Sequence, residues 1–550
     1  MRKVSLLILL ILFILLLADS SRAETFYVDW AHGSDSEDRN GSNGTLQSWK
    51  TLSYACGRVS GPDTIQINPN LHYVDDARCN LASGVTIKGA GADSTKITVK
   101  FAAAGGNSYI HRERPGKAIY PGNNDISGFT IDGDHKTLGT GIRLRGCDNI
   151  TIHDMKFQHI KSHAIALSGY NGWGSFKETM SAPPPSYGHN CAIHDVVIDD
   201  CSTQTTAEHD DRYGAIDLEG LADSQFYNLT INENYPQHGT GIKAVPGWLS
   251  NVKFYHNTIY NYETDTDCFN MEVYNLTDNS EIYDSNFHHL ISLNGGPVQA
   301  AGTWNLKIHN NDFKLLLGHL TGNEFSHNNL DIYQNYFHDG NTPAAGIWTT
   351  NGMTGSSVRN WRFHHNVVYN TSNGIYFGRQ SSANGNNNIS IYHNVFDSMT
   401  GHFWGGYGIN GEGLEGSCQG VTIKNNIFSN CAAGPAHLEG FTEVVFDYNL
   451  FHGGNRNLTG AVAGKHNIVA VPGFAGSTNP KLPRPVPYYA LSGPASNLHN
   501  SGVNVGLPFK GAAPDLGCCE YGASGTIGSS GLSPANPGKV PKAKGHGLRH

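Results

Sequence analysis

Short alternations of apolar and polar residues recur along most of the chain and stop at Gly or Asn after about five residues. The clearest copy spans residues 361–378, WRFHHNVVYNTSNGIYFG. In it, Phe363 is followed three positions later by Asn366 and five positions later by Val368, and a polar turn and a Gly-Ile-x-apolar segment complete the copy. The same apolar-Asn-apolar frame begins at seven positions: Phe254, Ile308, Ile332, Phe363, Ile391, Ile423 and Phe446.

The spacing of these copies predicts a solenoid built of strands. Three of the intervals, from Ile308 to Ile332, from Phe363 to Ile391 and from Ile423 to Phe446, are 24, 28 and 23 residues, so the period varies while the strand segments keep their length. A helical solenoid needs longer runs with apolar spacing near 3.6, which these segments lack. We therefore predict an all-β parallel solenoid whose loops absorb the variable period. The recurring Asn is expected to take a left-handed turn conformation and to stack coil on coil as a hydrogen-bonded ladder.

The first residues have the pattern of a secretory signal peptide. Arg2 and Lys3 precede an apolar run at 6–17, and Ser21 and Ala23 are small residues at a cleavage spacing. We predict cleavage after residue 23 and a secreted, extracellular protein, because no later segment is apolar enough to span a bilayer. Loss of three basic residues and one acidic residue then moves the formal net charge from −9 to −11. An acidic protein lacks the basic face that nucleic acid or an anionic membrane surface would require.

Ten cysteines in an exported chain predict disulfide bonds. Proximity in sequence favours the pairs Cys56–Cys79, Cys191–Cys201 and Cys418–Cys431, while Cys147 and Cys268 are candidates for burial in the solenoid. No Cys/His spacing matches a zinc site, and residues such as His364, His365 and His393 are expected at solvated or stacked turn positions of the repeat.

Both ends of the mature chain resemble secreted right-handed parallel β-helix proteins of the pectate-lyase-like superfamily. The motifs are an opening YV strand and acidic loop in TFYVDWAHGSDSEDRNGS, then SWKTL, PDTIQI, GVTIKGAG and the closing PDLGCCEYG. The resemblance implies a right-handed parallel β-helix over residues 24–522, with an N-terminal cap and first coils at 24–100. Cys518 and Cys519 stand where the usual ending of that superfamily has an alanine and a variable residue, which suggests a bridge that ties down the last coil. The Pro/Gly/Lys-rich residues 523–550 are expected to be disordered.

Alternation within the Gly-Ile-x-apolar strands places the residues between the apolar positions on the outer face, where they point to solvent. Strands stack about 4.8 Å apart, so these residues form a column along one face. Candidate catalytic residues in this column are Asp217, Glu219, Lys243 and Glu272. Candidate substrate-binding residues are Arg143, Arg145, Asn270, Asn294, Trp348 and Tyr376.

A face with acids, amides and aromatics suits a polysaccharide or other glycan as partner. Asp217 and Glu219 on one strand are about 7 Å apart, and Asp217 and Glu272, if two coils apart, about 9–10 Å. Both spacings fit an inverting glycoside hydrolase better than a retaining one. Alternatively, Lys243 is the proton-abstracting base of a polysaccharide lyase, with the acids holding Ca²⁺. A third interpretation is a non-catalytic carbohydrate-binding or surface-adhesion solenoid, in which the column provides only solubility and ion pairs.

Three acidic residues near the start, Asp29, Asp35 and Asp38, form a candidate calcium site, with a solvated turn as the alternative.

Long insertions are expected to form the walls of a cleft beside the column. The protein is expected to be a monomer. These insertions span 170–189, 204–212 and 262–267, the aromatic stretch 402–416 is a further sugar platform candidate, and secondary candidates within them are Asp210, Asp211, Asp265 and Asp267.

Overall fold

The computed structural model describes most of the mature chain. The described residues are 23–42, 44, 47–101, 108–113, 119–134, 138–169, 183–201, 214–233, 240–244, 247–261, 269–288, 290–294, 303–314, 320–323, 327–341, 343–348, 358–377, 386–401, 405–411, 418–481 and 484–522. The predicted signal peptide, except Ala23, and the predicted tail at 523–550 lie outside these residues. None of the described helices is both long and apolar enough to cross a membrane.

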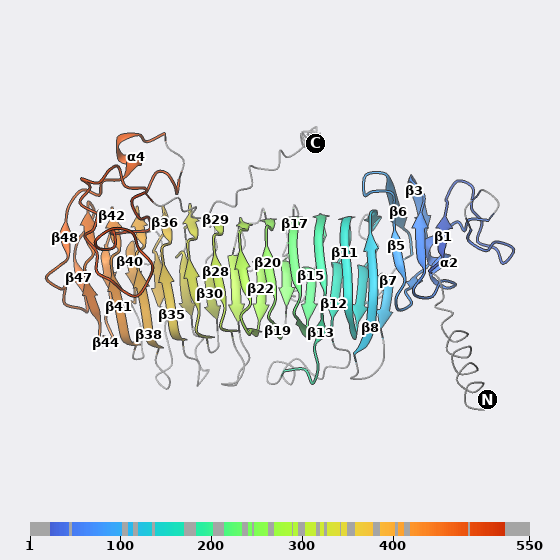
Figure 1. The fold of residues 1–550 in the computed structure, drawn as a ribbon, viewed down its shortest axis with the longest axis horizontal. Helices are drawn as coiled ribbons and strands as arrows, with labels where there is room; N and C mark the ends of the chain where they lie inside the picture. Colours follow the sequence, from blue (N-terminus) through green and yellow to red (C-terminus); the bar gives the residue numbers. More distant parts are fainter. Residues whose placement is uncertain are drawn as a thin grey trace, which may run out of the picture.

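Almost all regular structure is β-strand, and the strands stack side by side along the long axis of the molecule (Figure 1). Sheet B contains 14 strands, one from each successive coil. They are β4 (Cys79–Asn80), β7 (Ser108–Glu113), β10 (Thr140–Arg145), β12 (His163–Ser168), β15 (Gly214–Glu219), β18 (Thr240–Ala244), β22 (Phe269–Tyr274), β26 (Leu290–Asn294), β30 (Leu320–Asn323), β34 (Ala345–Trp348), β37 (Ile375–Phe377), β40 (Tyr407–Asn410), β43 (Gly434–His437) and β47 (Leu458–Thr459).

Sheet A contains 30 strands in two arms that meet at a corner of each coil. They are β1 (Thr25–Val28), β2 (Thr64–Ile67), β3 (Asn70–Asp75), β5 (Thr86–Lys88), β6 (Thr95–Val99), β8 (Tyr120–Ser127), β9 (Thr130–Asp132), β11 (Cys147–Gln158), β14 (Ala192–Asp199), β17 (Gln225–Glu233), β20 (Lys253–Tyr255), β21 (Thr258–Asn261), β24 (Glu281–Tyr283), β25 (Asn286–Phe287), β27 (Thr303–Trp304), β28 (Lys307–His309), β29 (Asp312–Lys314), β31 (His327–Asn328), β32 (Asp331–Tyr333), β33 (Tyr336–His338), β35 (Val358–His364), β36 (Val367–Tyr369), β38 (Asn386–Tyr392), β39 (Val395–Asp397), β41 (Cys418–Lys424), β42 (Ile427–Ser429), β44 (Phe441–Thr442), β45 (Val445–Asp447), β46 (Leu450–His452) and β48 (Ile468–Val469). A small sheet C joins β13 (Gly188–His189), β16 (Leu221–Ala222), β19 (Leu249–Ser250) and β23 (Leu276–Thr277), and the short helices are α2 (Leu52–Cys56) and α4 (Ala475–Thr478).

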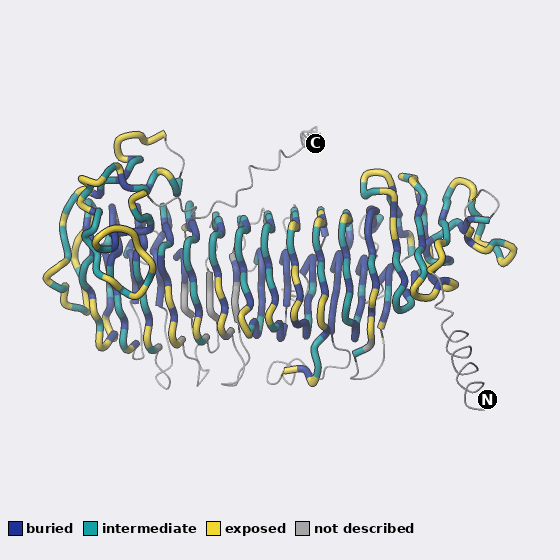
Figure 2. Tube along the Cα trace, in the orientation of Figure 1, coloured by how far each residue is buried: buried dark blue, intermediate teal, exposed yellow. Residues whose placement is uncertain are grey.

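Neighbouring strands in sheet B are parallel and come from consecutive coils, as in β12–β15 and β15–β18. The predicted all-β, right-handed parallel β-helix is therefore confirmed. Alternation turns apolar residues of the strands inward, and these residues stack into the core, which Figure 2 shows as a buried band along the molecule. Phe313, Phe337 and Phe363 stack in this way on successive coils.

The predicted asparagine ladder lies at the corner between the two arms of sheet A. The Nδ2 of Asn366 donates to Oδ1 of Asn394 at 3.1 Å, and the Nδ2 of Asn394 donates to Oδ1 of Asn426 at 2.9 Å. The expected left-handed conformation is wrong for these Asn residues. It falls on the residue before each of them, such as His365 and His393, because the Asn side chain turns inward to satisfy buried backbone groups.

One of the predicted disulfides, Cys56–Cys79, is present. The bond Cys191–Cys201 is wrong, because Cys191 is a free thiol and the extended strand β14 separates the two residues far beyond disulfide reach. The bond Cys418–Cys431 is wrong because strands β41 and β42 lie between two buried free thiols.

The predictions for the remaining cysteines also have mixed outcomes. Cys147 is buried as expected, and Cys268 lies outside the described residues. The expected bridge from Cys518 or Cys519 is also wrong, since both are free thiols. The last coil is tied down by packing instead, because the C-terminal segment folds back over sheet A and buries Tyr489, Leu498 and Leu516 there.

Candidate functional site

The outer face of sheet B carries the predicted column in a single continuous register. On successive strands from β7 to β40, the residues aligned in this column are His111, Arg143, Ala166, Asp217, Lys243, Glu272, Ser292, Thr321, Gly346, Tyr376 and Asn410. Asp217 and Glu272 are two coils apart with Lys243 between them, as the sequence predicted. Strand alternation therefore brings one cation and two acids together from three coils.

Further predicted residues occupy a second column two positions along each strand. It runs through Arg145, Ser168 and Glu219 on β10, β12 and β15. Farther along the molecule, Asn294 and Trp348 lie in one register position, two coils apart. The structure describes the backbone of these two residues but not their side chains.

The expectation that these side chains point into solvent is wrong for several of them. Lys243 is 2 % exposed, Glu272 4 % and Asn270 0 %, and Tyr376 is also buried. Arg143, Arg145, Asp217 and Glu219 are partly buried. Part of the reason is that side chains on neighbouring coils shield one another from solvent, because oppositely charged neighbours in a column bind one another rather than water.

Lys243 and Glu272 make the tightest of these contacts. Lys243 Nζ lies 2.8 Å from a Glu272 carboxylate oxygen, and both side chains are almost completely buried. A buried ion pair of this kind is costly to break, because removing one partner leaves the other charge buried and uncompensated. The Glu272 carboxylate is thus engaged in the ion pair with Lys243.

Asp217 and Glu219 are outside this ion pair and have raised pKa values. Burial raises the pKa of Asp217 to about 6, against the opposing charges of Arg145, Lys243 and Arg143. Burial and the nearby charge of Asp217 raise the pKa of Glu219 to about 7, although Ser168 hydrogen-bonds to its carboxylate. Two acids on one strand therefore titrate together near neutral pH.

Arg143 and Arg145 face these acids across strand β12, where the aligned residues are the small Ala166 and Ser168. Burial and the adjacent Arg145 lower the pKa of Arg143, while Asp217, Glu113 and Glu219 raise it. The small side chains on β12 leave the two guanidinium groups on one side and the two carboxyl groups on the other. This is the most strongly charged part of the described outer face of sheet B.

His163 belongs to this region but was not predicted from the sequence. It lies at the start of β12, is buried, and its Nδ1 donates to the Gly214 carbonyl oxygen at 2.8 Å. Burial, opposed by this hydrogen bond, lowers its pKa to about 4, and the charges of Arg143, Arg145 and Lys243 act in the same direction as burial. The strand pattern marks this position only as the first residue of a strand, so no sequence signal distinguished it.

The three candidate calcium ligands do not come together, and no group of three His, Cys, Asp or Glu suited to a metal occurs among the described residues. Asp29 instead accepts hydrogen bonds from the amides of Ala31 and His32 and from Asn68. Asp35 accepts from Thr51 Oγ1 at 2.6 Å and from the Lys50 and Thr51 amides. The Asp29 carboxylate stabilises a local turn, and the Asp35 carboxylate holds the residues that begin α2. The sequence pattern does not distinguish either role from metal ligation.

Most of the insertions predicted to wall a cleft fall outside the described residues. These include 170–182, 204–212, 262–267 and much of 402–416, together with Asp210, Asp211, Asp265 and Asp267. The site that the structure does place is the group Arg143, Arg145, Asp217, Glu219, Lys243 and Glu272 on sheet B.

Fold and site together define a parallel β-helix protein with a charged site on the outer face of one sheet. No protein-family model and no curated protein matches the chain. Among solved structures it is similar to a mutant tailspike protein of E. coli bacteriophage HK620 in complex with pentasaccharide, at 11% identity over 81% of each chain with a TM-score of 0.47.

Two further solved structures show weaker similarity. One is PfbA, a surface adhesin of Streptococcus pneumoniae, at 12% identity over 74% of this chain and 87% of that chain, with a TM-score of 0.36. The other is the catalytic unit of a GH87 alpha-1,3-glucanase from Streptomyces thermodiastaticus, at 12% identity over 77% of this chain and 68% of that chain, with a TM-score of 0.34. The fold of this chain rests on its own strand pairing, because likenesses this distant carry no further weight.

Proposed function

We propose that this chain is a secreted glycoside hydrolase that inverts the anomeric centre of a polysaccharide lying along sheet B. The observation that carries the proposal is the pair Asp217 and Glu219, whose pKa values are raised to about 6 and about 7 by burial on the same face of β15. A catalytic acid must hold a proton at neutral pH and its partner must be able to accept one, and raised, separated pKa values provide both.

The spacing of the pair supports inversion. Residues two apart on a strand point to the same face and lie about 7 Å apart, within the range of roughly 6.5–9.5 Å that leaves room for a water molecule. The alternative pair, Asp217 and Glu272, is less suitable because Glu272 is bound to Lys243 at 2.8 Å. We therefore assign catalysis to Asp217 and Glu219, and charge balance to Lys243 and Glu272.

The proposed reaction uses one proton shared by the two carboxyl groups. Glu219 donates its proton to the glycosidic oxygen as the bond between that oxygen and the anomeric carbon breaks. A water molecule attacks the anomeric carbon from the opposite face and gives its proton to Asp217. The form with one shared proton is most populated between about pH 6 and pH 7.

Several of the other predicted residues flank this pair along the proposed path of the sugar chain. Arg143 and Arg145 lie two coils before it and offer donors to sugar oxygens. Tyr376 lies beyond it in the first column, and Asn294 and Trp348 beyond it in the second.

The lyase alternative is weakened by the surroundings of Lys243. A lyase base must be free to take a proton from the substrate, whereas Lys243 Nζ is buried and lies 2.8 Å from the Glu272 carboxylate. The Ca²⁺ that this alternative requires also has no cluster of three ligands among the described residues.

The test is to incubate the mature protein, Glu219→Gln and Asp217→Asn with a panel of neutral and acidic polysaccharides, with and without calcium. We expect new reducing ends without the ultraviolet absorbance of an unsaturated uronate, and a loss of about 10²–10⁴ in kcat in each variant. Binding to the same polysaccharide should persist in both variants.

Three outcomes would contradict the proposal. Unsaturated product that depends on calcium and is lost in Lys243→Gln would assign a lyase. Unchanged cleavage in Glu219→Gln would remove the assigned acid. Binding without cleavage of any polysaccharide by the wild-type protein would leave a carbohydrate-binding solenoid.

A further inference from the structure

A second surface feature lies on sheet A, away from the charged site on sheet B. Eight rings stack on successive coils along the outer face of one arm of sheet A, in the order His153, His194, Tyr227, Tyr255, Tyr283, His309, Tyr333 and His364. Their centroids are 4.7–5.2 Å apart and their planes lie within 9° of parallel. Inside this aromatic ladder every ring face is covered by a neighbouring ring, so only ring edges reach solvent.

The aromatic ladder ends at His153 because the next coil supplies no ring. Ser127 is aligned with His153 on strand β8, and Lys88 is aligned with Ser127 on strand β5. The ring of His153 is fixed at both nitrogens, with Nδ1 2.7 Å from Asp154 Oδ2 and Nε2 3.1 Å from Asp125 Oδ1. The position above Ser127 therefore lacks a ring where the stacking geometry provides space for one.

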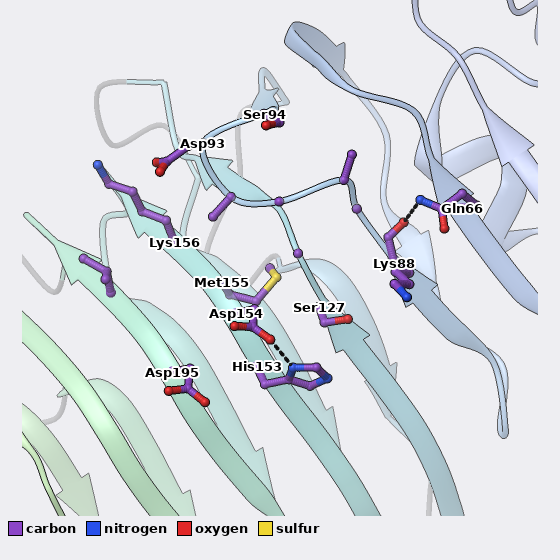
Figure 3. Close-up of a pocket in the computed structure, with 16 residues that line it drawn as sticks. Gln66, Lys88, Asp93, Ser94, Ser127, His153, Asp154, Met155, Lys156 and Asp195 are labelled. Atoms are coloured by element: carbon purple, nitrogen blue, oxygen red, sulfur yellow. Dashed lines mark hydrogen bonds and ion pairs between the residues drawn. The ribbon is translucent and has the colours of Figure 1, made fainter.

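This position opens into a pocket of about 950 Å³, which Figure 3 shows with His153 beside Ser127. We call it the ladder-end pocket. Its volume is in the range of small-ligand sites. One wall is the loop Gly89–Ser94, and the opposite side is formed by strands β11 and β14 through Lys156, Asp195 and Val197.

The loop wall is rigid. The Gly89 amide donates to the Ser127 carbonyl oxygen at 2.8 Å, the Gly91 amide donates to the Gly128 carbonyl oxygen at 2.7 Å, and Thr130 Oγ1 donates to the Ala92 carbonyl oxygen at 2.7 Å. Any side chain at Gly89 would clash with the Gly128 carbonyl oxygen, so the close crossing of loop and strand requires glycine there. The pocket is preformed, and a ligand would not have to order it.

The rim of the ladder-end pocket is mixed, because Met155 and Val197 supply apolar surface beside several polar groups. It includes the carboxylates Asp93, Asp154 and Asp195, the ammonium groups of Lys88 and Lys156, and the hydroxyls of Ser94 and Ser127. Asp154 and Asp195 each already bind a neighbouring histidine. Acids and bases are nearly balanced, which suits hydroxyl groups better than a polyanion or a cation.

A pyranose ring has the same distribution of polarity, with apolar faces and a rim of hydroxyls. An aromatic hydrocarbon would stack on His153 but would leave the charged rim without partners. We propose that the ladder-end pocket is a glycan-binding site, in which a neutral pyranose ring stacks on His153 above Ser127. This site does not rest on the proposed catalytic function, because it lies on a different sheet and uses none of the residues assigned to the reaction.

The test measures binding of neutral hexasaccharides (β-1,4-glucan, β-1,4-mannan, β-1,4-xylan and α-1,4-glucan) by calorimetry and by saturation-transfer NMR. The protein carries Glu219→Gln, so that cleavage does not interfere. Ser127→Tyr adds a tyrosine ring that stacks on His153 with the same spacing as in the rest of the aromatic ladder. This ring occupies the position proposed for the pyranose ring. We expect it to weaken binding of at least one hexasaccharide by tenfold or more and to raise the melting temperature, which shows that the variant folds.

Two controls locate the effect. Lys156→Ala removes an ammonium group of the rim and should also weaken binding, whereas Lys253→Ala removes a partly buried lysine of the same sheet outside the pocket and should not. Binding that is insensitive to Ser127→Tyr, no binding of any hexasaccharide at millimolar concentration, or preferential binding of p-nitrophenol would each overturn the proposal.

Discussion

Asp217 and Glu219 are held in a state that opposes folding at neutral pH. Each carboxyl loses hydration, and each has a pKa raised well above its ordinary value near 4. The nearby guanidinium groups of Arg143 and Arg145 only partly compensate. Catalytic groups are commonly placed in such an unfavourable environment, because the same feature that costs stability supplies the reactivity.

This predicts a pH-dependent effect of neutral substitutions on stability. A raised pKa means that the folded state binds the proton more tightly than the unfolded state, so stability is lost as pH rises from about 4 through 6 and 7. Asp217→Asn and Glu219→Gln should therefore raise the melting temperature at pH 8 and have little effect at pH 4. The measurement is a melting curve at each pH, and parallel pH profiles for variant and wild type would contradict it.

At the scale of the repeat element, the buried asparagine ladder connects one coil to the next. Asn394 is fully buried, its Nδ2 donates to the Phe363 carbonyl oxygen at 2.8 Å, and its Oδ1 accepts from the Asn366 amide at 3.0 Å. A hydrophobic residue of similar size would fill the space but would satisfy none of these groups. The repeat therefore keeps Asn because backbone groups at the corner need a partner.

Asn394→Ala is expected to destabilise the protein by about 2–4 kcal/mol, because it leaves buried backbone groups of two coils unsatisfied. Chemical denaturation measures this change. Asn455→Ala is the matched control, since Asn455 is exposed and accepts only a local hydrogen bond from the Asn457 amide. Equal effects of the two substitutions would show that the ladder has no special role.

At the scale of the whole molecule, the C-terminal segment completes the fold by covering part of sheet A. The outward positions Val367, Val395, Ile427 and Leu450 are apolar and buried, and they pack against Phe474, Tyr489, Leu491, Leu498 and Leu516. Tyr489 also donates to Asp397 at 2.7 Å, and Arg484 lies over the ring of Tyr369. Figure 1 shows this segment, with α4, lying against one end of the solenoid.

Removal of residues 472–550 should expose that apolar stripe and cause aggregation or a large loss of melting temperature. Removal of 523–550 alone is the control and should leave both unchanged. Size-exclusion chromatography and melting curves measure the two deletions. A monomeric, fully stable protein lacking 472–550 would show that the segment is dispensable.

The local pattern predicted much of this molecule. Alternation with period two and a recurring Asn were sufficient for the parallel β-solenoid, the aligned column on sheet B and the asparagine ladder, because each depends on the residues of one short strand and on regular stacking. The aromatic ladder on sheet A uses the same alternation, in residues such as Tyr255 and Tyr283, but the interpretation followed only the Gly-Ile strands and missed it.

Other features depend on which coils meet and on what covers them. The burial of Lys243 against Glu272, the cover of sheet A by the C-terminal segment, and the free thiols of Cys191, Cys418 and Cys431 are of this kind. Sequence proximity gave the correct pair Cys56–Cys79 but misplaced Cys191–Cys201 and Cys418–Cys431, because strands are extended and carry near neighbours apart. At the candidate calcium site, the carboxylates of Asp29 and Asp35 accept hydrogen bonds from backbone amides and from Thr51, and the acidic motif by itself does not identify these partners.

The sequence by itself determined the coil, its strands and the residues that each strand presents, since these follow from the chemistry of about five consecutive positions. Only the tertiary structure decided which of those residues lose water, which charges pair, and where the aromatic ladder stops beside a loop from another coil. Burial and electrostatics depend on groups far apart in the chain, and those groups give this protein its candidate site and its pocket.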